Sequence, residues 1–258
     1  MQSMRDILRS LTLILLLLTG TKLASAEKIH VACASNFSKT AKLLAASFEK
    51  KFPHKVVLSF GSSGKLYSQI TNGAPFDVFL SADIRRVKLL EENGYAVKGS
   101  RFTYAYGQLA LWRPGGLGKG TTADLIKKKV SHFSIANPKL APYGRASVEV
   151  LKKMGEWERL SGSVVMAENI SQAYAFISSG NAQMGLVGLS FLKGNQSVNS
   201  SHFSTIPTEW YSPIEQQAAP VSEKKAGIDF LNYLKGPESR RVIQNAGYQI
   251  PSVQVDKL

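Results

Sequence analysis

Apolar residues along the chain follow two spacings in alternation. Residues 29–34 form a short, almost wholly apolar run that predicts a β-strand. The apolar positions after it recur every three or four residues, the spacing of an amphipathic helix, at Phe37, Ala41, Leu44, Phe48 and Phe52. Pro53 ends that helix. Two more strands, predicted over residues 56–60 and 78–80, each precede another helical pattern, and this alternation is typical of a parallel α/β sheet.

The second half of the chain repeats the alternation less regularly. Short apolar runs again predict strands, over residues 108–112, 133–136 and 184–188. Three- and four-residue spacings predict helices over residues 146–154, 173–177 and 228–234. The last of these is a long helix that ends at Gly236-Pro237, whereas residues 193–202 have the polar composition of a surface loop. No flexible linker divides the chain, so any two lobes are expected to be joined by short crossings.

The first 26 residues have the composition of a secretory signal peptide. Arg5 and Arg9 supply a positive start, residues 11–18 are an apolar run, and residues 24–26 offer Ala-Ser-Ala at a cleavage site. The apolar run is shorter than the ~20 residues that a membrane span needs. We therefore expect export to the periplasm and cleavage after residue 26.

Charge and cysteine content narrow the functional classes. The 258 residues carry a formal net charge of +14, and cleavage would remove three basic and one acidic residue, which leaves +12. Such a charge suits nucleic acid, but export separates the chain from cytoplasmic DNA, so we expect no nucleic-acid partner. The electrostatic field of this positive charge would also draw small anions toward the protein. With Cys33 as the single cysteine, an intrachain disulfide is excluded.

Polar turns follow three of the predicted strands, each where a helix begins. They are Ser35-Asn36, Ser62-Ser63 and the loop at residues 142–144. Ligands of open parallel sheets bind beyond the carboxyl ends of the strands, and a helix N-terminus offers free, partly positive N–H groups. Converging turns of this kind can hold a doubly charged oxyanion with neutral donors alone. The simpler interpretation of each single turn is a helix cap, since Ser and Asn are preferred there.

Catalytic and metal motifs fit the sequence poorly. The run Gly-Ser-Ser-Gly-Lys at residues 61–65 lacks the second glycine of a nucleophile elbow, and it is not a phosphate-binding loop. None of the four histidines stands at metal-ligand spacing, so we expect neither a metal site nor a cofactor. Asp77 and Asp83 flank a predicted strand, and we interpret them as a helix cap and a structural partner rather than as paired catalytic acids.

Three basic residues occupy unfavourable places. Lys39, Lys65 and Arg145 fall in the first turns of predicted helices, where the helix dipole disfavours positive charge. The favoured interpretation is a solvated surface position for each. The alternative is that they face an incoming anion.

Several longer motifs are specific enough to indicate a family. The most specific is Gly-Ala-Pro-Phe-Asp-Val-Phe-Leu-Ser-Ala-Asp at residues 73–83. Others lie at residues 31–37, 60–64, 136–138, 142–144, 168–170 and 185–188. Together they resemble the periplasmic molybdate-binding proteins of ABC importers, over essentially the whole chain after residue 26. The resemblance implies an α/β, two-lobed type II periplasmic binding protein, with mixed sheets flanked by helices and a ligand cleft between the lobes.

The resemblance also implies the ligand contacts. In this family Ser or Thr hydroxyls, backbone amides and sometimes Asn and Tyr side chains hold one oxyanion. Matched position by position, the oxyanion-binding residues are Ser35, Asn36, Ser63, Tyr143 and Ile170, with Ser62 and Gly144 as additional candidates. Some members have a ligand tyrosine where this chain has Gly188, and Tyr143 would serve here instead. Molybdenum would be present only inside the molybdate ion, without direct protein ligands.

The implied lobes are residues 27–106 together with 216–258, and residues 107–215, joined near residues 104–108 and 212–218. The implied protein is a monomeric, high-affinity receptor for molybdate, and for tungstate, which delivers the ion to the membrane permease of an ABC importer without catalysis. Other functions stay open. They are a receptor for another oxyanion such as sulfate, an exported serine hydrolase using Ser62 or Ser63, and a structural or adhesive protein.

Overall fold

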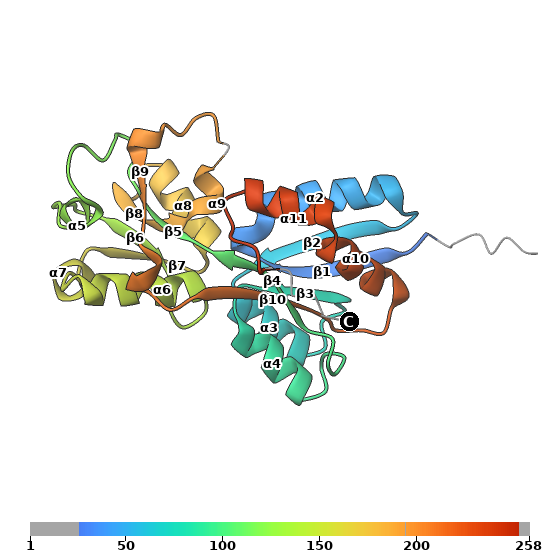
Figure 1. The fold of residues 1–258 in the computed structure, drawn as a ribbon. Helices are drawn as coiled ribbons and strands as arrows, with labels where there is room; N and C mark the ends of the chain where they lie inside the picture. The colour runs from blue at the N-terminus through green and yellow to red at the C-terminus, as the bar shows by residue number, and fades with distance from the viewer. Residues whose placement is uncertain (1–25, 194, 253–258) are drawn as a thin grey trace, which may run out of the picture.

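The structure is a computed structural model that describes residues 26–193 and 195–252. The predicted signal peptide, apart from Ala26, lies outside the described residues. The described chain forms two five-stranded sheets, each with helices packed against it, and the two units lie side by side (Figure 1). The predicted α/β class with two mixed sheets is confirmed.

The first sheet has the strand order β2-β1-β3-β10-β4. Its strands are β1 (Lys28–Ala34), β2 (Lys55–Gly61), β3 (Val78–Ser81), β4 (Phe102–Gly107) and β10 (Ile214–Pro220). Strand β1 pairs in parallel with β2 and β3, and β10 runs antiparallel between β3 and β4. The packed helices are α2 (Ser38–Lys51), α10 (Lys225–Lys235) and α11 (Pro237–Asn245) on one face and α3 (Ser63–Thr71) and α4 (Ile84–Glu92) on the other (Figure 1). We call this sheet and its helices lobe 1.

The second sheet has the order β7-β6-β8-β5-β9. Its strands are β5 (Leu109–Trp112), β6 (Phe133–Ala136), β7 (Val164–Ala167), β8 (Met184–Gly188) and β9 (Phe203–Thr205). The helices around it are α5 (Thr122–Ile126), α6 (Pro142–Lys153), α7 (Trp157–Ser161), α8 (Ile170–Ser178) and α9 (Leu189–Leu192). We call this unit lobe 2. Short 3-10 helices complete the chain: η1 (Ser35–Phe37), η2 (Ser200–His202) and η3 (Thr208–Trp210).

Two short crossings join the sheets. Strand β4 ends in lobe 1 at Gly107, and β5 begins in lobe 2 at Leu109. The return passes from η3 into β10, which begins at Ile214. The sheet changes therefore fall next to the expected crossings, while the lobe limits of 27–106, 107–215 and 216–258 stay a prediction.

The central strands explain why the sequence showed continuous apolar runs. Strands β3, β6 and β8 are buried at every position, because helices cover both faces of each sheet. The edge strand β2 has partly exposed residues along most of its length. The runs at residues 29–34, 56–60, 78–80, 108–112, 133–136 and 184–188 are confirmed as strands, except that the fourth of these strands begins at Leu109.

Some elements differ from the sequence-based expectation. Helix α2 begins at Ser38 and ends at Lys51, because Phe37 belongs to the 3-10 turn η1 and Phe52 has extended backbone. The helix predicted to be the last, α10, does end at Lys235, but Pro237 then opens a further helix, α11, in the first-turn position that suits proline. Strand β10 escaped prediction because its sequence, Ile-Glu-Gln-Gln-Ala-Ala-Pro, lacks a continuous apolar run.

Candidate functional site

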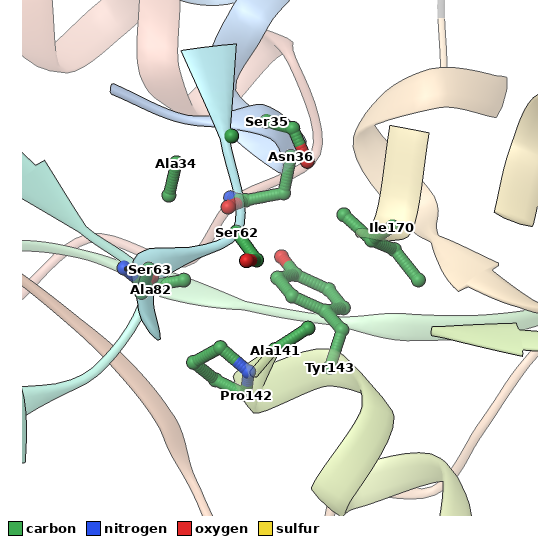
Figure 2. A pocket seen from close by; sticks show the side chains of 11 residues that line it. Ala34, Ser35, Asn36, Ser62, Ser63, Ala82, Ala141, Pro142, Tyr143 and Ile170 are labelled. Carbon is green, nitrogen blue, oxygen red and sulfur yellow. Dashed lines mark hydrogen bonds between the residues drawn. The ribbon is translucent and has the colours of Figure 1, made fainter. Parts of the chain in front are cut away.

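The carboxyl ends of parallel strands from both lobes meet at one cavity. In lobe 1, β1 and β2 lead into η1 and α3, and in lobe 2, β6 and β7 lead toward α6 and α8. The cavity is lined by Ala34, Ser35, Asn36, Gly61, Ser62, Ser63, Ala82, Ala141, Pro142, Tyr143 and Ile170 (Figure 2). Six of the seven predicted site residues are among these, and only Gly144 is not. The cavity is small, because the centre of a water-sized sphere can occupy only about 10 Å³ of it, roughly the space that one water molecule needs by that measure.

Each serine of the cavity accepts a hydrogen bond from a backbone N–H group. Ser63 Oγ accepts from Ala82 N at 2.9 Å, and Ser62 Oγ accepts from Lys65 N at 3.4 Å, as the cap of α3. Ser35 Oγ accepts from Ser171 N, across the lobes, at 3.4 Å. Because none of these hydroxyls donates to another protein atom within the described part of the chain, their O–H groups are free to donate to a ligand.

Tyr143 brings a fourth hydroxyl to the cavity from the start of α6. Its side chain is 1% exposed, and its hydroxyl has no hydrogen-bond partner among the described residues. Burial raises the pKa of Tyr143 well above its usual value, so the phenol keeps its proton and remains a donor. A Cβ added at Gly107 would lie 2.2 Å from Tyr143 Oη. The glycine at the end of β4 therefore leaves the space that this hydroxyl occupies.

Gly188 and Gly144 lie near Tyr143, and each makes room for a different group. A Cβ at Gly188 would lie 3.4 Å from Tyr143 Cε1, so the position where some relatives carry tyrosine adjoins the ring that Tyr143 supplies here. A Cβ at Gly144 would lie 2.3 Å from the backbone oxygen of Ala136. Gly144 thus allows α6 to approach the end of β6 closely, and the cavity wall is formed by its neighbours.

Asn36 is held from behind by buried hydroxyl and amide groups. Its Nδ2 donates to Gln216 Oε1 at 2.8 Å and to the Tyr248 hydroxyl at 3.3 Å. Its backbone oxygen accepts from Ser190 Oγ at 3.1 Å and from Tyr248 at 2.7 Å. Figure 2 shows its amide near the hydroxyls of Ser62 and Tyr143. Sequence reasoning did not find Gln216, because it lies 180 residues away on a strand without an apolar pattern.

Ile170 lines the cavity as the first residue of α8. Asn169 caps this helix, with its side chain accepting from Gln172 N at 3.1 Å. Backbone N–H groups in the first turn have no partner within the helix, so α8 directs donors toward the cleft. Asn169 is thus the helix cap, and the role of Ile170 as a backbone ligand stays a prediction.

Basic residues around the cavity bind the opposite lobe. Lys65 pairs with Glu168 at 3.1 Å, and Arg145 pairs with Asp83 at 3.0 Å. Both side chains are partly exposed, as the interpretation of surface positions expects, and the structure adds that each is paired across the lobes. Lys39 lies in a separate surface groove formed by α2, α9 and α11.

Backbone contacts also hold the lobes together. Gly64 N donates to Leu140 O at 2.9 Å, and Arg86 Nη2 donates to Lys139 O at 3.2 Å. The lobes therefore contact each other around the cavity, as in a closed form. Asp83 also caps α4 by accepting from Arg86 N, which confirms its structural interpretation. Asp77 likewise has structural partners, among them the backbone N of His30.

The cavity lining carries no charge. No carboxylate, imidazole, Lys or Arg side chain is among the lining residues, so the serines lack a base beside them. Within the described ranges, no group of three or more His, Cys, Asp or Glu residues could hold a metal ion. Over the same ranges, no helix combines the length and apolar character needed to cross a bilayer.

A small, neutral, donor-lined cavity between two α/β lobes defines a solute-binding protein. Residues 29–249 match the family of bacterial extracellular solute-binding proteins, and the chain belongs to that family. The resemblance to periplasmic molybdate-binding proteins is confirmed by the relatives. The chain is 44% identical to the molybdate-binding protein ModA of Azotobacter vinelandii, over 87% of this chain and 91% of the relative. It is 42% identical to ModA of Rhodobacter capsulatus, over 87% and 89% of the two chains.

Solved structures show the same fold. The periplasmic molybdate-binding protein of Azotobacter vinelandii superposes with a TM-score of 0.81 at 37% identity, covering 86% of this chain and 99% of that one. The sulfate-binding protein SubI of Mycobacterium tuberculosis has a TM-score of 0.69 at 12% identity, covering 88% of each chain. At that identity the second likeness concerns the fold alone.

Proposed function

We propose that the chain binds molybdate, and tungstate, in the cavity between the lobes and delivers the ion to the permease of an ABC importer. One observation carries this proposal: the cavity offers hydroxyl donors that have no acceptor among the described residues. Ser35, Ser62, Ser63 and Tyr143 each have a free O–H group. A ligand that only accepts hydrogen bonds satisfies all four.

The absence of a carboxylate from the lining selects the protonation state of the ligand. Phosphate near neutral pH carries a proton, and burying an O–H group without an acceptor costs about 1–3 kcal/mol. No carboxylate lines the cavity to accept that proton. Fully deprotonated molybdate, tungstate and sulfate avoid this cost.

Size would separate molybdate and tungstate from sulfate. Mo–O and W–O bonds are longer than S–O bonds, so donors spaced for the larger ions leave gaps around sulfate. The donors come from both lobes, since Ser35 and Ser63 belong to lobe 1 and Tyr143 to lobe 2. Closure of the lobes then fixes the radius that the ion has to match.

Binding and delivery follow from closure. The ion would first bind the serines of lobe 1, and the donors of Tyr143 and the first turn of α8 would then stabilise the closed form. Only contacts made in the closed form shift the equilibrium toward it. The permease would recognise surfaces of both lobes in that form. The receptor works as a periplasmic monomer, without a cofactor, nucleic acid or catalysis.

Thermal unfolding of the dialysed protein with single anions tests the function. A ligand at 100 times its Kd adds about 2.7 kcal/mol of stability, which raises Tm by roughly 5–11 °C for a chain of this size. We expect a rise with molybdate and tungstate, and none with sulfate or phosphate. The Ser63→Ala variant should lose most of the rise, while Ser68→Ala, an exposed serine on the same helix, should keep it. An equal rise with sulfate would favour the alternative of a general oxyanion receptor, and no rise with any anion would refute the proposal.

A further inference from the structure

The side chain of Gln216 lies directly behind the cavity, where the proposed function gives it no part. Gln216 is completely buried, at 0% exposure, on the strand that enters lobe 1 from lobe 2. The register of β10 against β4 shifts between Gln216 and Gln217, and such a bulge re-aims the side chain beside it. Gln216 Oε1 accepts from Asn36 Nδ2 at 2.8 Å and from the Tyr104 hydroxyl at 3.1 Å.

In this orientation, the Asn36 amide presents its oxygen, not its N–H group, to an anion in the cavity. Asn36 Nδ2 has two hydrogens, and both go to Gln216 and Tyr248. Within the described part of the chain, the group of the Asn36 side chain left without a partner is then Oδ1, an acceptor, which would repel an oxyanion. Gln216 Nε2, in turn, is a buried donor without a partner among the described residues. An unpaired buried donor of this kind is costly.

A second mismatch lies beside Gly107. A Cβ added there would lie 2.2 Å from Tyr143 Oη and 3.1 Å from Gln216 Nε2. Two donors without partners thus flank the same glycine. If an acceptor replaced one of these two donors, the other donor would have a hydrogen-bond partner.

In the reverse orientation of both amides, with the nitrogen and oxygen positions exchanged, each mismatch disappears. Gln216 Nε2 would then donate to Asn36 Oδ1 and to the Tyr104 hydroxyl, which can donate in turn to Ser81 O at 3.3 Å. Gln216 Oε1 would replace Nε2 beside Tyr143. The Tyr248 hydroxyl, 3.3 Å from the Asn36 amide, can donate to the new Oδ1 position. Asn36 Nδ2 would be free to donate into the cavity.

We propose that Gln216 is the positioning residue of the oxyanion site: with its Nε2 donating to Asn36 Oδ1, it holds the Asn36 amide so that the Asn36 N–H group faces the ligand. This inference rests on the proposed function, because it needs an oxyanion in the cavity. It makes the bulge of β10, at one of the two crossings between the lobes, part of ligand recognition.

A double-mutant cycle on molybdate affinity tests the coupling. Gln216→Met keeps the side-chain volume but removes both polar atoms, and we expect it to weaken binding about tenfold, the value of one hydrogen bond to a charged group. In an Asn36→Ala background the same substitution should change the affinity by less than about twofold, because its effect passes through Asn36.

Gln217→Met is the matched control. Gln217 is the next residue of the same strand and is also buried, but its amide bonds Arg101 and Thr103, not Asn36. This variant should bind as the wild type does. An equal loss from Gln216→Met in both backgrounds would overturn the inference, and failure of the wild type to bind would overturn the proposed function itself.

Side-chain amide resonances of the wild-type protein provide a measurement that needs no variant to fold. On saturation with molybdate, the ¹⁵N-detected NH₂ signals of Asn36 and Gln216 should both shift, and that of Gln217 should stay in place. Unchanged signals of Asn36 and Gln216 in a protein that binds the ion would overturn the inference.

Discussion

Replacing Tyr143 by Phe should have opposite effects on the free and the ligand-bound protein. In the closed form the hydroxyl is buried at 1% exposure without a partner among the described residues. Such a group costs about 1–3 kcal/mol, so its removal should stabilise the ligand-free closed form by up to that amount. Because about 1 kcal/mol shifts Tm by roughly 2–4 °C in a chain of this size, the apo Tm should rise, by up to several degrees.

The same substitution should weaken binding. A hydrogen bond to a charged group contributes about 1.5–3 kcal/mol, which is about 10- to 150-fold in Kd. Titration calorimetry with molybdate measures the affinity, and thermal unfolding of the ligand-free protein measures the stability. Both measurements use the same preparation, so a misfolded variant would be recognised by its lowered Tm.

Tyr211→Phe is the matched control. The Tyr211 hydroxyl accepts from the backbone N of Leu109 at 3.2 Å, outside the cavity. Its loss leaves that N–H group unpaired, so the control should lower the apo Tm and leave the affinity unchanged. A Tyr143→Phe protein that is less stable than the wild type when free, or that binds molybdate equally well, would refute the reasoning.

Three further outcomes follow from the same geometry. Gly107→Ala should abolish most binding, measured by calorimetry, because the new Cβ would lie 2.2 Å from Tyr143 Oη and displace it. Arg145→Gln should weaken binding only about 1.5- to 5-fold, mainly in the dissociation rate measured by stopped flow. Arg145 is partly exposed and the buried Asp83 keeps its pair with Arg86, so the lost pair is worth about 0.2–1 kcal/mol; high salt should erase the difference. Stability should fall as pH rises above about 10, where an unfolded tyrosine loses its proton while the folded one keeps it. Unfolding midpoints between about pH 8 and 11 check this, since burial raises the pKa of the tyrosines Tyr104, Tyr143 and Tyr248.

Local sequence determined much of lobe 1 and the polar turns. Strand β1 and helix α2 could be predicted because each has its own apolar spacing within a few residues. Ser62, Asp83 and Asn169 are caps because the preference for a cap depends on the turn that follows. The placement of polar turns after strands was likewise sufficient to predict most of the residues that line the cavity between the lobes.

The partners of the site residues depended on the tertiary structure. Strand β10 has no apolar run, and it forms because β3 and β4 pair with both of its edges. Gln216 reaches Asn36 across 180 residues of sequence, and Lys65 reaches Glu168 across 103. Neither contact can be predicted from the spacing of apolar and polar residues near it in the sequence.

The sequence by itself thus determined the α/β elements, the donor-rich turns and the family. Only the tertiary structure decided which donors remain without acceptors, that Gly107 makes room for Tyr143, and that Gln216 stands behind Asn36. The physical reason is the range of the forces involved. Backbone periodicity and capping act within one or two turns of the chain, whereas hydrogen bonding and steric exclusion at the cavity depend on atoms that only the packing of two lobes brings within about 3 Å.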